Sequence, residues 1–226
     1  MKKTTLVLLT LVVAFGLFGA AAWLTSMGRT PAPDSAATAV TRVEVSEPDR
    51  LVRPHSPVLG REDAPVTIVE FFDPACEACR AFHPTVKRIL AQNPDTVRVV
   101  LRYTPFHGEG SEVAIAILEA ARDQGVFEPV LEALLDRQNE WASHGAPAPE
   151  RIMGIAAAAG LEEERARLLM QSPETIGLIN ADRRDVEALG VRGTPTFFVN
   201  GEPLAAFSPR ELIETVERAV SRVQGS

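Results

Sequence analysis

The sequence is poor in cysteine, because Cys76 and Cys79 are the only two cysteines among 226 residues. A structural zinc site usually takes four ligands, and the chain has no second cysteine pair, while its four histidines are scattered. A structural disulfide between these two residues is also a poor explanation, since so small a loop adds little chain-entropy stabilisation. The scarcity of cysteine therefore favours a reactive dithiol.

The chain is also short of positive charge, with 23 lysines and arginines against 30 aspartates and glutamates and a formal net charge of −7. It contains neither a block of basic residues nor an internal repeat. A protein that binds nucleic acid needs positive charge to neutralise phosphates. The composition therefore argues against a nucleic-acid partner.

The N-terminus carries no charge between Lys3 and Arg29 and is rich in leucine, valine, phenylalanine and alanine. This composition predicts a signal peptide or an N-terminal membrane anchor over residues 1–28. The alanines at 20–22 suit cleavage, whereas the apolar length and Trp23 favour an uncleaved anchor, which we prefer. Either outcome predicts that the rest of the chain works in the periplasm or at the extracytoplasmic face of a membrane, where conditions are oxidising.

Residues 29–57 are rich in proline, alanine, threonine and aspartate without a lasting period, which is typical of a flexible linker. From residue 58 the chain becomes organised, and we expect one domain over 58–226. Two mostly apolar, β-branched segments, 66–72 and 97–101, predict buried strands. Residues 76–91 between them have helical apolar spacing, so this part predicts a right-handed parallel βαβ unit.

Helical apolar spacing then continues for about eighty residues and is broken by glycines and a proline. This stretch predicts a helical insertion at about 108–190. The individual helices are expected at 111–124, 127–141, 149–159, 162–170 and 172–189.

The C-terminal part predicts a β-hairpin followed by a helix. Residues 196–199 and 203–207 flank Asn200-Gly201, the strongest short signal for an antiparallel hairpin. Ser208, Pro209 and Glu211 then combine an N-cap, a first-turn proline and a capping-box acid. The whole order, βαβ, helical insertion and ββα, predicts one α/β domain.

Three motifs in combination carry a family resemblance: a strand leading into Cys76-x-x-Cys79 at a helix start, Pro84 within that helix, and Gly193-Thr194-Pro195-Thr196-Phe197 opening the hairpin. Together they resemble the thioredoxin fold, and the insertion resembles its DsbA-like branch, over about residues 58–224. The resemblance implies that Pro195 is a cis proline facing the cysteines. It also implies that the backbone of Thr194 pairs with an extended substrate peptide.

The position of each thiol predicts its role. Cys76 lies at the helix start, where unpaired N–H groups and the helix dipole favour a thiolate, so we expect it to be the nucleophile. Cys79 would then resolve the mixed disulfide. Glu70 occupies the place where this fold carries a buried acid, which predicts a raised pKa and proton transfer with Cys79. The alternative for Glu70 is an acid near the strand end that reaches solvent or an arginine.

These features predict a thiol–disulfide oxidoreductase without a cofactor other than its dithiol. We favour introduction of disulfides into exported proteins, with reoxidation by a membrane redox partner. The direction stays open, because Glu77 and Ala78 replace the proline and histidine of the DsbA pattern, and a carboxylate disfavours the Cys76 thiolate. A threonine before the cis proline also occurs in isomerase-like relatives, so a reductase or isomerase is the alternative.

A function of a different class is also open. Cys76, Cys79 and His83 lie at i, i+3 and i+7 on one helix face, a spacing that suits a soft metal such as Cu(I). This alternative is a metal-binding or metal-delivery module. His83 as a helix-surface or partly packed residue is the simpler interpretation.

Overall fold

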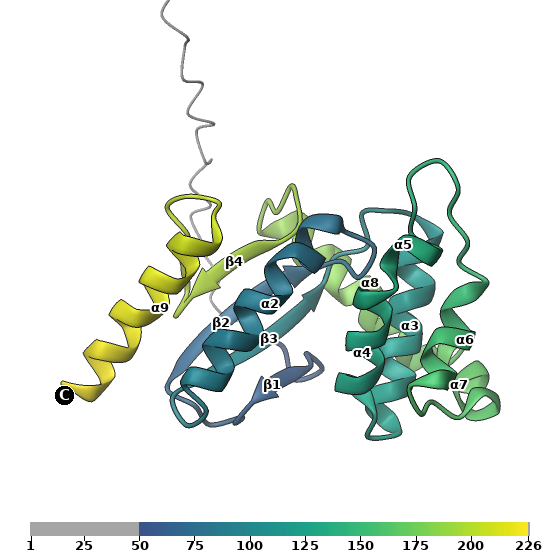
Figure 1. Ribbon diagram of the computed structural model, residues 1–226, viewed down its shortest axis with the longest axis horizontal. Coiled ribbons are helices and arrows are strands. Elements are labelled where there is room, and N and C mark those ends of the chain that lie inside the picture. The colour runs from purple at the N-terminus through teal and green to yellow at the C-terminus, as the bar shows by residue number, and fades with distance from the viewer. Residues whose placement is uncertain (1–49, 226) are drawn as a thin grey trace, which may run out of the picture. The chain divides into compact units, whose positions relative to one another are not determined.

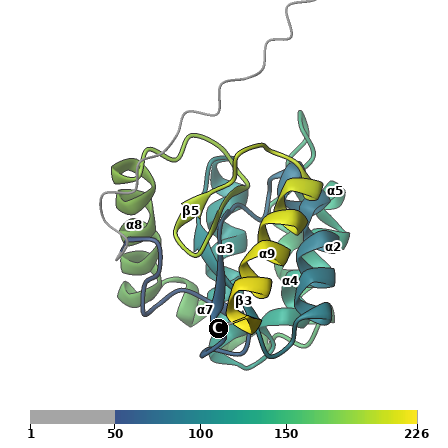
Figure 2. The ribbon, with the colours of Figure 1, turned by 90° about the vertical axis from the view of Figure 1, so that its left-hand side faces the viewer.

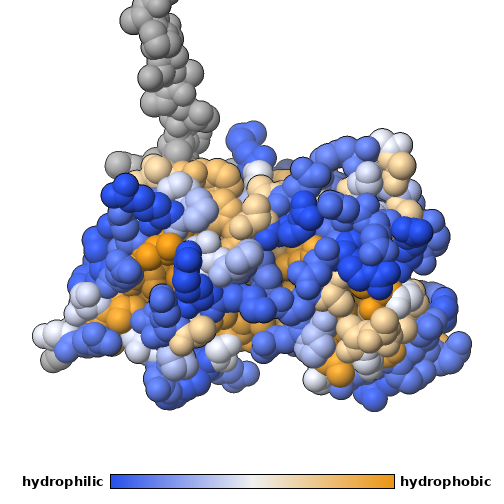
Figure 3. Space-filling view, in the orientation of Figure 1, coloured by the Kyte–Doolittle hydropathy of each residue, from blue (hydrophilic) through white to orange (hydrophobic). Residues whose placement is uncertain are grey.

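A computed structural model of the protein describes residues 50–225 (Figure 1). The predicted signal peptide or anchor at 1–28 and most of the predicted linker lie outside the described residues. Within residues 50–225, no helix is both long and apolar enough to cross a membrane. The face drawn in Figure 3 is mostly hydrophilic, with separate hydrophobic areas between the polar residues.

The centre of the domain is a five-stranded mixed sheet with the strand order β1-β3-β2-β4-β5. β2 and β3 pair in parallel and the other neighbours pair antiparallel. β2 has its predicted bounds, β3 extends two residues beyond its predicted end, and β1 was not predicted because it is only three residues long. The strands are β1 (Val58–Gly60), β2 (Val66–Phe72), β3 (Val97–Tyr103), β4 (Thr196–Val199) and β5 (Glu202–Pro203).

The predicted hairpin is confirmed, with β4 and β5 joined by Asn200 and Gly201 at φ angles of 49° and 86°. Both angles are positive, as a tight hairpin turn of the primed type requires. The predicted extent of the second strand, 203–207, was wrong. After Pro203, Leu204 N–H still donates to the carbonyl of Phe197 on β4 at 3.3 Å. The chain then leaves the sheet to bring Ser208 to the start of the last helix, where its hydroxyl accepts from Glu211 N–H.

Helices cover both faces of the sheet. α2 (Glu77–Gln92) and α9 (Pro209–Gln224) lie together on one face, and α8 (Pro173–Ala188) lies on the other side of β3 (Figure 2). α2 continues through Pro84 without a break. Because side chains alternate along a strand, Glu70 of β2 shares a face with Ile68 and Phe72, which pack in the same cluster as α2.

The helical insertion is confirmed between β3 and β4, with one difference. The segment 127–141 forms two helices rather than one, because the backbone leaves helical geometry at Arg137, with φ −101° and ψ 16°. The indole N–H of Trp141 donates to the carbonyl of Leu134 across this break at 2.9 Å. Besides α8, the insertion contains α3 (Glu109–Asp123), α4 (Phe127–Asp136), α5 (Gln138–Trp141), α6 (Arg151–Ala158) and α7 (Glu163–Met170).

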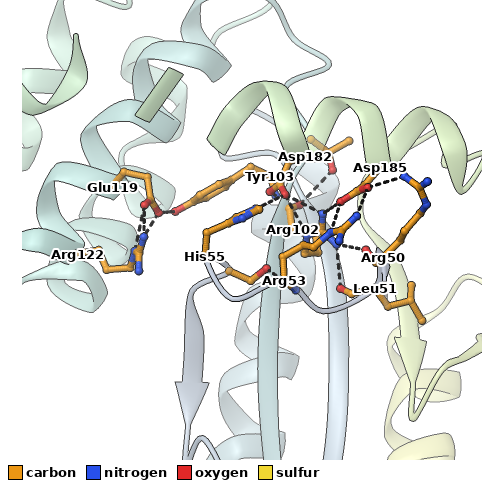
Figure 4. Close-up of polar contacts among 12 residues, drawn as sticks. Arg50, Leu51, Arg53, His55, Arg102, Tyr103, Glu119, Arg122, Asp182 and Asp185 are labelled. Carbon is orange, nitrogen blue, oxygen red and sulfur yellow. Dashed lines mark hydrogen bonds and ion pairs between the residues drawn. The ribbon is translucent and has the colours of Figure 1, made fainter. Parts of the chain in front are cut away.

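Residues 50–57 pack on the domain although the sequence suggested that they belong to the linker. The buried guanidinium of Arg102 on β3 donates to Asp182 and Asp185 of α8, and to the carbonyl of Leu51 at 3.1 Å (Figure 4). Arg53 donates to Asp185 as well. This ion-pair network joins the N-terminal end of the described chain to the sheet and to α8.

Candidate active site

Cys76 is the N-cap residue of α2, with an extended backbone (φ −77°, ψ 120°). Its carbonyl accepts from Arg80 N–H at 3.1 Å, while its own N–H donates to the carbonyl of Asp73 at 3.0 Å. The Sγ atom lies 3.2 Å from the carbonyl oxygen of Thr194. Both cysteines are free thiols; Cys76 is 6% exposed and Cys79 is completely buried.

The surroundings of Cys76 favour its thiolate. A hydrogen bond from Cys79 lowers the pKa of Cys76 most, and further hydrogen bonds come from the Thr194 hydroxyl and the N–H groups of Cys79 and Ala78. Burial acts in the opposite sense, but the donors outweigh it, and the pKa of Cys76 is lowered to about 5.

The second thiol is shifted in the other direction. Burial raises the pKa of Cys79 far above its ordinary range, and the hydrogen bond to Cys76 and the charge of Glu70 add to the rise. Cys79 therefore keeps its proton in the reduced protein and donates a hydrogen bond to the Cys76 sulfur. The pair is divided into one thiolate near the surface and one buried thiol.

Glu70 is buried as the sequence suggested, at 3% exposure on β2. Burial raises its pKa to about 8, and the negative charge of Cys76 contributes a smaller part. Its side chain points to the face covered by α2, and it interacts electrostatically with Cys79. The expected raised pKa is therefore present, and the alternative of an acid that reaches solvent or an arginine does not fit the described residues.

The loop before β4 faces the cysteines. The Thr194–Pro195 peptide bond is cis, as the resemblance implied. Next to Pro195, an apolar groove extends towards Phe207, whose side chain is 58% exposed and stacks on Phe82 at a centroid distance of 4.9 Å. The groove is lined mainly by Val191, Pro195, Phe197, Pro203, Leu204 and Phe207.

The two remaining residues singled out in the sequence contact side chains other than the sulfurs. Glu77 is exposed in the first turn of α2, where its Oε1 lies 3.9 Å from His144 Nε2. His83 Nε2 lies 2.8 Å from Glu132 Oε1 on α4, so its ring is engaged away from the dithiol. Among residues 50–225, no three histidine, cysteine, aspartate or glutamate side chains are placed to hold a metal ion.

Two buried side chains that sequence reasoning missed also hold the turn before α2. One carboxylate oxygen of Asp73 accepts from Ala75 N–H. The other oxygen accepts from the backbone N–H groups of Phe106 and His107 and lies within hydrogen-bond distance of the His107 ring. Gln138 of α5 donates to the carbonyls of Pro74 and Cys76, as described below. Asp73 could have been found from its position just before the cysteine motif, whereas Gln138 lies 62 residues from Cys76 and carries no local signal.

Residues 53–218 match the family described as Thioredoxin. The chain belongs to this family. Among solved structures, it resembles a thioredoxin-like oxidoreductase from Silicibacter pomeroyi DSS-3, with 34% identity and a TM-score of 0.66 over 77% of this chain and 98% of that chain. It also resembles oxidised BdbD from Bacillus subtilis, with 26% identity and a TM-score of 0.64 over 74% of this chain and 93% of that chain.

The chain is a DsbA-like member of this family, with Cys76 and Cys79 as its CxxC pair, as the resemblance implied. Disulfide bond formation protein D of Bacillus subtilis is 27% identical over 72% of this chain and 76% of that protein. The Na(+)/H(+) antiporter NhaA of Herminiimonas arsenicoxydans is 33% identical over 73% of this chain but only 25% of its own length. The chain thus spans only 21–25% of the length of the NhaA antiporters that it matches.

Proposed function

We propose that this protein is a thiol–disulfide oxidoreductase that introduces disulfide bonds into exported proteins. The observation that supports this direction is the contrast between Cys76, with a pKa lowered to about 5, and Cys79, with a pKa raised by burial. A thiolate that is stabilised in the reduced protein makes the disulfide form a stronger oxidant. Glu77, the departure from the DsbA pattern, is exposed and does not prevent this lowering.

The reaction begins with the Cys76–Cys79 disulfide. A client thiolate attacks Cys76 Sγ, the bond between the two cysteines breaks, and Cys79 leaves as a thiolate that takes a proton from the protonated carboxyl of Glu70. A second client thiolate then attacks the client sulfur of the mixed disulfide and releases Cys76 as a thiolate. The client loses two electrons and gains a disulfide, while the dithiol gains them.

The reverse sequence of steps uses the same residues. When Cys79 attacks a mixed disulfide at Cys76, Glu70 in its ionised form accepts the Cys79 proton. A pKa of about 8 keeps Glu70 able to give or take a proton near neutral pH. Glu70 therefore serves the buried thiol in both directions of electron flow.

Client binding uses the loop before β4. We assign the backbone of Thr194 to pairing with an extended client segment, because the Thr194 carbonyl lies 3.2 Å from Cys76 Sγ. The apolar groove beside Pro195 would receive apolar client side chains that are exposed only before the client has folded. Unfolded, thiol-containing proteins are therefore the proposed substrates.

The proposal also includes a cellular compartment and a membrane redox partner. The kinship with a disulfide bond formation protein and the apolar, uncharged stretch after Lys3 support a place outside the cytoplasm, in the periplasm or at a membrane surface. A membrane-bound redox protein would reoxidise the dithiol after each cycle. An uncleaved segment 1–28 would hold the two close together.

The experiment that tests the direction is the equilibrium of the Cys76–Cys79 couple with glutathione. An oxidase should have a potential well above that of thioredoxin, about −270 mV, and nearer to about −120 mV. It should also form disulfides in a reduced, unfolded client in a stoichiometric reaction. A potential near that of thioredoxin, with faster reduction than oxidation of clients, would instead favour the reductase or isomerase alternative.

A further inference from the structure

Gln138 joins the helical insertion to the reactive turn. It is the first residue of α5 and is only 1% exposed. Its Nε2 group donates to the carbonyl of Pro74 at 2.8 Å and to the carbonyl of Cys76 at 3.0 Å. Both acceptors belong to the short turn that leads from β2 into α2.

The carbonyl of Cys76 is part of the nucleophilic residue, so its charge matters for the sulfur. A carbonyl oxygen carries partial negative charge, which disfavours a thiolate nearby. An amide nitrogen with two N–H groups brings partial positive charge to both carbonyls and fixes the direction in which they point. Loss of this amide would leave the Pro74 carbonyl without this donor and the Cys76 carbonyl with only Arg80 N–H, so the partial negative charge of the turn that carries Cys76 would be less compensated.

We propose that Gln138 is a positioning residue through which the helical insertion sets the reactivity of Cys76. It acts on the backbone of the turn and does not touch the sulfur. This inference deepens the proposed function and rests on it, since the stability of the Cys76 thiolate determines how strongly the disulfide oxidises a client. The insertion thus contributes to the chemistry as well as to the shape of the domain.

The oxygen atom of the same amide argues against a role in packing alone. Gln138 Oε1 is the one buried side-chain oxygen or nitrogen in the described part of the chain that has no hydrogen-bond partner. Leaving a buried acceptor unsatisfied costs stability, so an apolar side chain of similar length would pack at lower cost. The two donated hydrogen bonds are the property that only the amide supplies.

The backbone around Gln138 is arranged to aim it at the turn. The helical geometry is interrupted at Arg137, directly before it, and the Trp141 indole satisfies the Leu134 carbonyl across this interruption. From the other side, Asp73 fixes the same turn by accepting from Ala75 N–H. Side-chain hydrogen bonds from Gln138 and to Asp73 therefore both hold the reactive turn.

The test compares Gln138→Met with a matched control, Gln124→Met. Methionine keeps the length of the side chain and removes both donors together with the unpartnered oxygen, so the variant is expected to fold. Gln124 also donates through Nε2 to a carbonyl, that of Glu162 at 3.1 Å, but at an exposed site outside the reactive turn. The readouts are the pKa of Cys76, from the ultraviolet absorbance of its thiolate, and the equilibrium constant with glutathione.

We expect Gln138→Met to raise the pKa of Cys76 by about one unit. The reduced form is then destabilised about tenfold near neutral pH, which lowers the potential by about 30 mV. Gln124→Met should leave both quantities as in the wild type. A merely structural role of Gln138 would lower the free energy of unfolding without moving either quantity.

A second variant keeps the proposal open to refutation if methionine prevents folding. Gln138→Leu removes the same two donors with a smaller apolar side chain, so the pKa of Cys76 should rise as in Gln138→Met. A folded variant of either kind with an unchanged pKa and glutathione equilibrium would overturn the inference. Failure of the proposed function would be seen separately, as a wild-type protein that does not oxidise clients.

Discussion

The Sγ atom of Cys76 lies 3.2 Å from the carbonyl oxygen of Thr194, so the reactive sulfur faces the loop that precedes β4. The Cys79 thiol is completely buried and donates a hydrogen bond to the Cys76 sulfur. One sulfur thereby faces the loop, and the other is kept from any contact with solvent. This division of the pair determines what each substitution should do.

Cys76→Ser should abolish disulfide exchange, because it removes the thiolate that forms the mixed disulfide. Cys79→Ser should instead accumulate mixed disulfides between Cys76 and clients, since the resolving thiol is gone. Trapped species can be identified by mass spectrometry after acid quenching.

Alkylation of the reduced wild-type protein as a function of pH checks the same assignment. Labelling of Cys76 should follow a single ionisation with a pKa of about 5, whereas Cys79 should stay unlabelled throughout the range in which the protein is folded. Preferential labelling of Cys79 at mildly acidic pH would mean that the roles of the two thiols are reversed.

Glu70→Gln should slow the attack of Cys79 on the mixed disulfide by about 10²-fold or more, because it removes the proton acceptor and keeps the shape of the side chain. The first attack on Cys76 should change much less. Stopped-flow measurements that resolve the two steps provide the comparison. Equal slowing of both steps would show that Glu70 has no specific link to Cys79.

Glu70 should also affect the pH dependence of stability. Its pKa is 4.5 in a model compound and about 8 in the folded protein, so folding favours the protonated form. The wild type should therefore lose stability relative to Glu70→Gln as the pH rises from about 4.5 to about 8, with an upper limit of about 5 kcal/mol. Denaturant unfolding across this range measures the difference.

The control for this experiment is Glu202→Gln, which removes an exposed acid from β5 of the same sheet. The pH dependence of its stability should match that of the wild type. If Glu70→Gln behaves in the same way as this control, the burial of Glu70 does not perturb its ionisation.

Much of the fold could be predicted because its signals are local. The apolar run of β2, the Asn200-Gly201 turn and the cap at Ser208 each specify their own structure within a few residues. The second hairpin strand was overestimated for the opposite reason, since where it ends depends on how the chain reaches α9. The break at Arg137 had no signal, because the helical spacing of residues 127–141 continues through it.

The residues of the candidate site also differ in whether a local sequence signal identifies them. Cys76, Cys79 and Pro195 belong to short motifs, and Glu70 was found because a charge in a buried strand is unusual. Gln138 was missed, because only the folded insertion brings it to the Cys76 turn. Arg102 was also missed, since its partners Asp182 and Asp185 lie about eighty residues away in the sequence, on α8.

Arg102→Met should lower the free energy of unfolding by about 3–5 kcal/mol, because it removes the buried guanidinium that the Asp182 and Asp185 carboxylates share. Disulfide exchange by the molecules that remain folded should be unchanged, since the network is separate from the dithiol. Denaturant unfolding at neutral pH gives the loss. Arg61→Met, which breaks exposed ion pairs with Asp63 and Asp95, should have little effect.

The same network predicts a response to acid. Burial alone would raise the pKa of Asp185, but hydrogen bonds from Arg53 and Arg102 outweigh it and hold the pKa well below its ordinary range. The stability from this carboxylate is fully present above about pH 3.8 and is lost as the pH falls below that value. Asp185→Asn should therefore be less stable than the wild type at neutral pH, and the gap should narrow in acid.

Phe207→Ala tests whether the groove beside Pro195 binds clients. Phe207 is exposed and stacks on Phe82, so its removal takes apolar surface from the groove without opening the core, and the pKa of Cys76 should not change. The KM for an unfolded client should rise about three- to tenfold with kcat preserved, while the rate with a small disulfide such as oxidised glutathione stays the same. Leu168→Ala on α7 removes an even more exposed apolar side chain outside the groove and should leave both substrates unaffected. Equal loss with client and glutathione would show that Phe207 supports the active site itself, and no loss with either would mean that clients bind elsewhere.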